Sequence, residues 1–140
     1  MPRTLMERQA ELLKALGHPA RLFIVQMLAE AAEAAEAPDE AERAGAAGAG
    51  EKCVCEIIPA LGMEQSSVSK HLAVLRERGV VEVRREGTRM FYRLTDRRVM
   101  AIVRLAREIC VTQLAQAQRM LAETPQQGRQ ALPGGEVPPA

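Results

Sequence analysis

QSSVSKHLAVLRERGVVEVRREGTRMFYRL, residues 65–94, is the stretch that decides the expected fold. Its first half repeats apolar residues on a 3.6-residue period, which indicates one buried helical face formed by Val68, Leu72, Val74 and Leu75. An amphipathic helix is therefore predicted from Gln65 to Arg78. Gly79 follows directly, and a glycine after a periodic run is typical of a helix end.

The second half of this stretch predicts a β-hairpin. Two runs rich in β-branched and aromatic residues, Val80–Arg85 and Arg89–Leu94, flank a turn at Glu86-Gly87-Thr88. A helix that opens with short polar side chains, followed by a basic hairpin, suits a winged DNA-binding head. Its helix would enter the major groove and its hairpin would contact the flanking backbone.

Charge is distributed unevenly, although the net charge is only +1 over 140 residues. Nine Lys or Arg residues stand against four acidic ones between Ser66 and Arg98, whereas residues 31–51 hold six acidic residues and one Arg. A basic stretch in a near-neutral chain favours phosphate binding. A solvated charged face is the alternative, but the polar helix beside the basic run favours nucleic acid.

A second, shorter helix is predicted just ahead of the first. Residues 54–61 carry apolar side chains at helical spacing and are closed by Gly62, so the segment Gly62-Met63-Glu64 becomes a tight turn between two helices. Such a pair is a helix-turn-helix. Glu64 occupies the expected N-cap of the longer helix, where Ser, Thr, Asp or Asn would cap better.

Two further helices are expected near the N-terminus, Thr4–Leu16 and Ala20 to about Glu30. His18 and Pro19 separate them, and Pro19 is well placed in the first turn of the second helix. At this boundary, His18 is expected to cap or hydrogen-bond the helix rather than to bind a metal.

The last helix is predicted from an N-cap at Asp96 to about Glu123, and it carries an apolar stripe over its whole length. About 28 residues span roughly 40 Å, more than the small head can cover. The stripe is therefore expected to pack against a second subunit and the first helix. The resulting homodimer would match the two-fold symmetry of an inverted-repeat operator.

Composition and low-complexity segments define the expected domain organisation. One mainly α-helical domain is predicted over residues 1–123, with a flexible Ala/Glu/Gly-rich insertion at about 33–51 that Pro38 separates from the second helix, and a disordered tail over 124–140. We expect no leader and no membrane partner, since no apolar run could span a bilayer. Three cysteines, an odd number, then favour reduced thiols in a cytoplasm.

The order of these elements and several separated motifs resemble the ArsR/SmtB family of winged helix-turn-helix repressors. The motifs are Leu16-Gly17-His18-Pro19-Ala20-Arg21, Ser66-Ser67-Val68-Ser69-Lys70-His71-Leu72 and Arg85-Glu86-Gly87. The resemblance covers about Leu12 to Ala106, apart from the insertion. It implies a mainly α fold with a small β-hairpin, a homodimer formed through the first and last helices, and a repressor that leaves its operator when an inducer binds.

The resemblance also implies which residues contact DNA. Groove contacts fall on Gln65, Ser66, Ser67, Ser69, Lys70 and His71, and phosphate contacts on Arg84, Arg85 and Arg89. Gln and Ser can bond to base edges, whereas Lys and Arg here supply mostly salt-dependent affinity. For His71 an inward-facing or dimer-facing position is an equal alternative.

The inducer site must be found among the cysteines. A common site of the family, on the last helix, is absent because Asp96 is followed by Arg97 and Arg98 and the later positions carry Ile109 and Thr112. The run Lys52-Cys53-Val54-Cys55-Glu56 resembles that of arsenic- and cadmium-responsive members, although a third Cys close to the pair is missing. Metal ligands are therefore expected at Cys53, Cys55 and Cys110, with trivalent arsenic or antimony as the inducer and other soft metal ions as alternatives, because soft thiolates select soft acceptors.

Helical geometry suggests how binding would act. Residues two apart on an α-helix point about 200° apart, since each residue turns about 100°. Cys53 and Cys55 therefore cannot converge on one ion while that turn is helical, so binding is expected to unwind or reshape the turn and to move the short helix that braces Gln65–Arg78. Two states with different DNA affinity would result.

Other functions of the thiols stay open. Cys110 could pair with Cys53 or Cys55 in a thiol-redox or persulfide sensor, which would need no metal ion. Cys110 could also be a core residue on the apolar stripe. A constitutive DNA-binding protein with inert cysteines is a third possibility. A thiol enzyme is disfavoured, because the sequence lacks a phosphate-binding loop or a nucleophile–base arrangement near the pair, and no cofactor is required.

Overall fold

The computed structural model describes residues 3–36 and 48–131, with side chains described as far as residue 123. The chain divides into two compact units, Met1–Ala101 and Ile102–Ala140, and each is described by itself. Pro38 and most of the predicted insertion, together with residues 132–140 of the predicted tail, lie outside the described residues.

The first unit begins with helices α1 (Leu5–Leu16) and α2 (Pro19–Ala34), as the sequence predicts. Thr4 and Glu7 form a reciprocal capping box at the start of α1. The predicted capping role of His18 is confirmed, because its Nδ1 accepts a hydrogen bond from the backbone N–H of Ala20 at 3.0 Å. Helix α2 continues beyond Glu30 to Ala34.

The helix-turn-helix is formed by α4 (Val54–Leu61) and α5 (Gln65–Glu77). Gly62 ends α4 with φ +64°, a left-handed conformation that glycine adopts without steric cost. Glu64 precedes α5 without a side-chain capping bond, in line with its poor capping propensity. The predicted boundaries of α5 are confirmed to within one residue.

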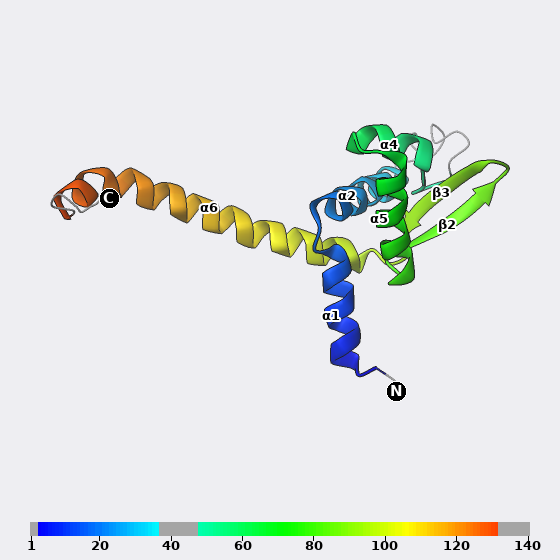
Figure 1. Cartoon of the computed structure of the whole chain (residues 1–140), viewed down its shortest axis with the longest axis horizontal. Coiled ribbons are helices and arrows are strands. Elements are labelled where there is room, and N and C mark those ends of the chain that lie inside the picture. The colour runs from blue at the N-terminus through cyan, green and yellow to red at the C-terminus, as the bar shows by residue number, and fades with distance from the viewer. Residues whose placement is uncertain (1–2, 37–47, 132–140) are drawn as a thin grey trace. The chain divides into compact units, whose positions relative to one another are not determined.

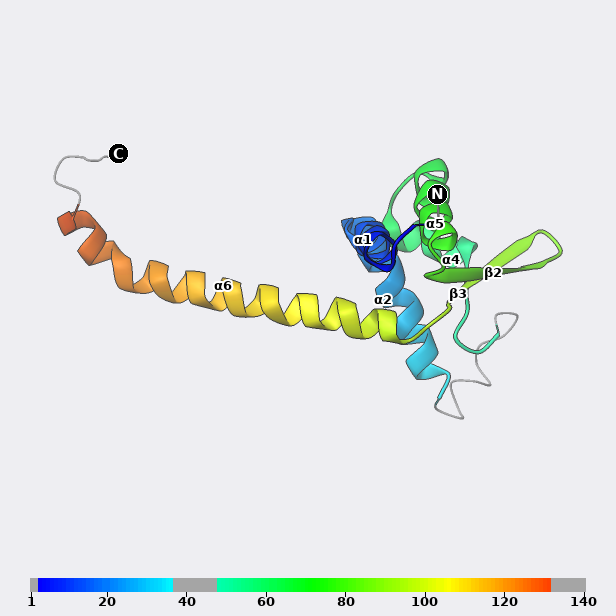
Figure 2. The same ribbon diagram turned by 90° about the horizontal axis from the view of Figure 1, so that it is seen from below.

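The hairpin consists of β2 (Val81–Glu86) and β3 (Arg89–Leu94), joined by the two-residue loop Gly87-Thr88. A third strand, β1 (Lys52–Cys53), pairs antiparallel with β3, so the sheet order is β1-β3-β2. Strand β1 is not predicted from the sequence, because two residues are too short to show a strand period. The tip of the hairpin projects beyond the helices (Figure 2).

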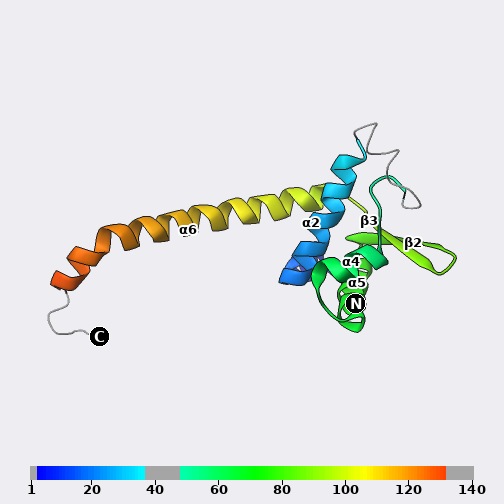
Figure 3. The same ribbon diagram turned by 90° about the horizontal axis from the view of Figure 1, so that it is seen from above.

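The core of this unit lies where α2, α4 and α5 meet the sheet (Figure 1). Helices α4 and α5 pack together beside the base of the hairpin (Figure 3). The largest fully buried side chains come from all of these elements and include Ile24, Leu28, Ile57, Leu72, Leu75 and Phe91. Burial of this apolar surface stabilises α5 against the sheet and fixes which of its faces remains outside.

Helix α6 (Arg98–Ala131) begins next to Asp96, whose carboxylate accepts a hydrogen bond from the backbone N–H of Arg98 at 2.9 Å. The predicted capping role of Asp96 is therefore confirmed, and the helix continues past the predicted end at Glu123. Large apolar side chains along it are exposed: Leu105, Ile109, Val111, Leu114, Met120 and Leu121. No helix within the described residues has the length and apolar character needed to cross a bilayer.

Candidate DNA-binding face and thiol pair

Helix α5 has one buried face and one exposed polar face. Val68, Leu72 and Leu75 are at most 1% exposed and hold the helix against the core. The outer face carries Gln65, Ser66, Ser69 and Lys70, all of them exposed, whereas Ser67 is half-buried. The short side chains leave the backbone of the first turns accessible, as a helix that enters the major groove of DNA requires.

His71 lies on the side of α5 that faces α2. Its ring centroid is 4.3 Å from that of His18, and its Nδ1 is 3.4 Å from the Arg21 guanidinium. Burial, together with the neighbouring charges of His18 and Arg21, holds the pKa of His71 below its ordinary value. Of the two positions that the sequence left open for His71, the half-buried, inward one is observed.

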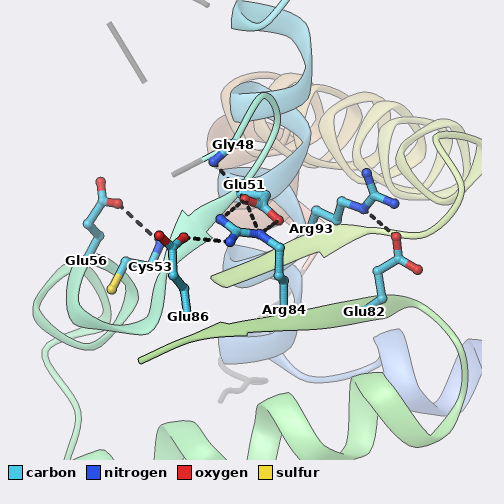
Figure 4. Close-up of polar contacts among 8 residues, drawn as sticks. All are labelled: Gly48, Glu51, Cys53, Glu56, Glu82, Arg84, Glu86 and Arg93. Atoms are coloured by element: carbon cyan, nitrogen blue, oxygen red, sulfur yellow. Dashed lines mark hydrogen bonds and ion pairs between the residues drawn. The ribbon is translucent and has the colours of Figure 1, made fainter. Parts of the chain in front are cut away.

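The basic side chains of the wing fall into two groups. Arg85 and Arg89 are exposed near the tip of the hairpin, and no ion pair among the described side chains includes either of them. Arg84, in contrast, donates hydrogen bonds to the carboxylates of Glu51 and Glu86 (Figure 4). These bonds raise the pKa of Arg84. Its guanidinium also lies 4.7 Å from the centroid of the Phe91 ring.

Several other residues of the basic stretch are also paired with acids. Arg93 bonds to Glu82 on the adjacent strand, and other pairs join Arg78 to Glu11, Arg97 to Glu36 and Arg98 to Asp96. The local positive charge counted from the sequence is therefore partly neutralised within the fold. Lys70, Arg85 and Arg89 are exposed, and no ion pair among the described side chains includes them.

Cys53 and Cys55 are joined by a disulfide bond, with their Cα atoms 5.1 Å apart. Cys53 is not helical: it is the N-cap of α4 with φ −68° and ψ 142°, and its sulfur accepts a hydrogen bond from the Cys55 N–H at 3.2 Å. The expectation that the two sulfurs converge only when a helical turn unwinds is therefore wrong. It assumed helical geometry for both residues, whereas the extended backbone of Cys53 directs its side chain over the first turn.

The environment of the pair is asymmetric. Cys53 is 3% exposed, whereas Cys55 is exposed at the start of α4. The Cys53 N–H donates to the Glu56 carboxylate at 3.2 Å, which completes a capping box. The pair thus combines one sheltered sulfur with one that solvent can reach.

Cys110 is a free, exposed cysteine on α6, in the second unit. Within the described residues, no three His, Cys, Asp or Glu side chains are grouped so that they could hold a metal ion. A three-sulfur site made by Cys53, Cys55 and Cys110 therefore remains a prediction.

Glu51 is the functional candidate that the sequence analysis missed. It was counted only as one acid of the insertion, yet its side chain is 7% exposed and bonds to both Arg84 and the backbone N–H of Gly48. Arg84 holds the pKa of Glu51 below its ordinary value. The available signal was weak: a lone acid two residues before a cysteine pair.

Comparison with known proteins identifies a single family. Residues 47–83 match the family described as "Bacterial regulatory protein, arsR family". The chain is 38% identical over 103 residues to an HTH-type transcriptional regulator of Methanocaldococcus jannaschii, covering 74% of this chain and 96% of that protein. It is 36% identical over 121 residues to the biofilm growth-associated repressor of Xylella fastidiosa, covering 84% and 90%.

A solved structure extends the likeness to the fold. The homodimeric winged helix-turn-helix DNA-binding domain of Mb0332 from Mycobacterium bovis superposes with a TM-score of 0.59 at 30% identity, covering 80% of this chain and 86% of that one.

Proposed function

This chain belongs to the ArsR family of helix-turn-helix transcriptional regulators, and from that premise we propose that it is a homodimeric repressor controlled by its Cys53–Cys55 pair. It binds an inverted-repeat operator through α5 and the β2–β3 hairpin. It releases the operator when the thiols react with an inducer. The observation that carries the DNA-binding part is the polar outer face of α5, which is held in place by a fully buried inner face.

The exposed residues divide the work of DNA binding. Gln65, Ser66 and Ser69 can hydrogen-bond to base edges in the major groove and so supply sequence preference. Lys70, Arg85 and Arg89 contact phosphates and supply affinity that falls with salt. His71 does not contact DNA; it positions α5 through its contact with His18 at the start of α2.

Exposed apolar surface supports the dimer. On α1 the side chains of Leu5, Met6 and Leu13 are more than half exposed, and α6 carries its own exposed apolar residues. Covering such surface with a second copy stabilises the pair by the hydrophobic effect. A two-fold dimer then presents two α5 helices to the two halves of an inverted repeat.

Trivalent arsenic or antimony is the proposed inducer. The reduced pair offers two thiols whose sulfurs meet at the N-terminus of α4, and soft thiolates favour soft acceptors. Two thiols displace two hydroxyls of arsenous acid and release two water molecules, so two As–S bonds form. Cys110 is proposed as the third ligand, in place of the remaining hydroxyl. No resident cofactor is needed, and the reduced thiols suit a cytoplasmic location.

Arsenite titration tests this proposal. The reduced dimer is bound to an operator fragment and arsenite is added while fluorescence anisotropy reports DNA binding. We expect release from the wild-type protein and no release from Cys53→Ser/Cys55→Ser, with weaker release from Cys110→Ser. Unchanged DNA binding by the wild-type protein, or full release from the double variant, would contradict arsenic sensing.

A thiol-redox or persulfide sensor is the second candidate, and the bond between the Cys53 and Cys55 sulfurs favours it. Two thiols lose two protons and two electrons to an oxidant such as a peroxide or polysulfide, which is reduced in turn. Cys110 is the alternative partner of either cysteine. This function predicts release of DNA after oxidation without arsenite, and mass spectrometry of the oxidised protein would identify the bonded pair.

A further inference from the structure

Glu51 and Arg84 form a multiply bonded ion pair across 33 positions of sequence. Arg84 Nε donates to both Glu51 carboxylate oxygens, at 3.2 and 3.1 Å, and Nη2 donates to Oε1 at 2.9 Å. The Gly48 N–H donates to the same Oε1 at 2.7 Å. A carboxylate that is 7% exposed and accepts this many bonds holds a fixed position (Figure 4).

The ion pair lies beside one row of residues that crosses the whole sheet. Cys53 on β1 pairs with Phe91 on β3, and Phe91 pairs with Arg84 on β2. The Arg84 guanidinium also lies over the Phe91 ring. Glu51 lies two residues before Cys53, which is on β1. Its carboxylate bonds to Arg84, which is on β2 in the same row as Cys53.

Arg84 is poorly available to phosphate in this arrangement. Nε and Nη2 donate to Glu51, and Nη1 donates to Glu86 at 2.7 Å, so every guanidinium nitrogen has a carboxylate partner. Neutralisation by two acids removes the charge that would attract DNA. The phosphate contact expected for Arg84 is therefore better assigned to its neighbours Arg85 and Arg89.

We infer that the Glu51–Arg84 ion pair is the positioning contact that transmits the state of the Cys53–Cys55 pair to the wing. This inference rests on the proposed function, because it assumes that the thiols react. A reaction at Cys53 changes the hydrogen bonds of the α4 N-cap and displaces β1. Glu51 moves with β1 and, through its bonds to Arg84, shifts β2 and the hairpin tip. Arg84 and Glu51 are thus positioning residues and do not contact DNA.

The experiment measures two quantities for each variant. The first is the dependence of operator affinity on salt for the reduced protein, which counts phosphate contacts. The second is the coupling ratio, the operator dissociation constant after treatment with arsenite or a thiol oxidant divided by that of the reduced protein. The variants are Glu51→Gln, Arg84→Gln and their double mutant, with Arg85→Gln as the matched control on the same strand. Thermal unfolding checks that each variant is folded.

We expect Glu51→Gln and Arg84→Gln to lower the coupling ratio by about 2- to 30-fold, without further loss in the double mutant, and to leave the salt slope unchanged. Arg85→Gln should lower the salt slope by about one and leave the coupling ratio unchanged. Arg84→Lys keeps the charge but loses the planar fork, so it should lower the coupling ratio as well.

Three results would overturn the inference. An Arg84→Gln salt slope that falls like that of Arg85→Gln, with a normal coupling ratio in Glu51→Gln, would make Arg84 a phosphate contact. A coupling ratio of one in the wild-type protein, for both arsenite and oxidant, would remove the sensing function and the transmission with it. A wild-type ratio above one that Glu51→Gln leaves unchanged would remove the transmission alone.

Discussion

The imidazole rings of His18 and His71, 4.3 Å apart at their centroids, join the start of α2 to the DNA-facing helix α5. His18 also caps α2 through Nδ1, and Arg21 of α2 reaches both the Nδ1 of His71 and the carbonyl oxygen of Ala15. The His18 ring and the Arg21 guanidinium therefore both contact His71 on the inner side of α5, while Gln65, Ser66, Ser69 and Lys70 on its outer side are exposed.

Acidification should weaken this contact. The pKa of His71 is lowered from 6.5 in the folded protein by burial first, and then by His18 and Arg21. The unfolded chain therefore binds a proton more readily, so stability is full above about pH 6.5 and falls as the pH drops below that value towards the folded pKa. The midpoint of thermal unfolding should decrease between pH 7.5 and 5.5. His71→Gln should flatten part of this dependence, and an identical pH profile in the variant would contradict the assignment.

Leu72 and Ser69, one turn apart on α5, should have opposite roles. Leu72→Ala removes a side chain that is 1% exposed, so it should lower the free energy of unfolding by about 2–5 kcal/mol. Ser69 is exposed, so Ser69→Ala should change the free energy of unfolding by less than about 0.5 kcal/mol while lowering operator affinity. Urea unfolding and anisotropy measure the two effects, and a Ser69→Ala protein with full operator affinity would exclude Ser69 from the interface.

Lys70 should contribute affinity without sequence preference. Lys70→Gln is expected to weaken binding to operator DNA and to non-operator DNA to a similar extent. It should also reduce the slope of log affinity against log salt concentration by about one. Gln65→Ala should instead reduce discrimination between the operator and a fragment with one altered base pair. Titrations at several salt concentrations measure both, and equal salt slopes for wild type and Lys70→Gln would show that Lys70 is not a phosphate contact.

Substitution of Gly62 should lower stability for a purely conformational reason. Its φ is +64°, and a Cβ placed there meets no atom within 4 Å, so no clash contributes. Gly62→Ala should cost about 1–2 kcal/mol because an L-residue disfavours the left-handed region. Gly62→Asn should cost less, since Asn tolerates this conformation. Chemical unfolding measures the stability of both variants. Equal losses of unfolding free energy in Gly62→Ala and Gly62→Asn would point to a cause other than backbone conformation.

Exposed apolar residues of α6 should hold the dimer together. Leu105 and Ile109, one helical turn apart, are 61% and 59% exposed in the single chain. Leu105→Glu/Ile109→Glu should shift the protein to monomers and weaken operator binding, because two charges would have to be buried in the interface. Analytical ultracentrifugation measures this shift. The exposed Glu108→Gln is the control and should leave the dimer intact.

Local patterns in the sequence predicted most of the secondary structure. Helical periodicity and Gly79 placed α5 within one residue of its observed end, and the two β-rich runs placed β2 and β3. The caps at His18 and Asp96 were predicted as well, since each bond joins residues two positions apart. The exposed polar face of α5 followed from the same periodicity, because a helix that buries one stripe leaves the opposite one outside.

Tertiary structure decided the contacts between residues distant in sequence. Strand β1 exists because Lys52 and Cys53 lie against β3, and the bonds of Arg84 to Glu51 follow from that alignment. The position of His71 depends on how α2 packs against α5. The sequence alone determined which segments fold and which faces are polar, since those properties depend on neighbours within a few residues. Only the folded chain decided which charges are neutralised and which side of α5 His71 occupies, because those properties depend on how separate elements align in space.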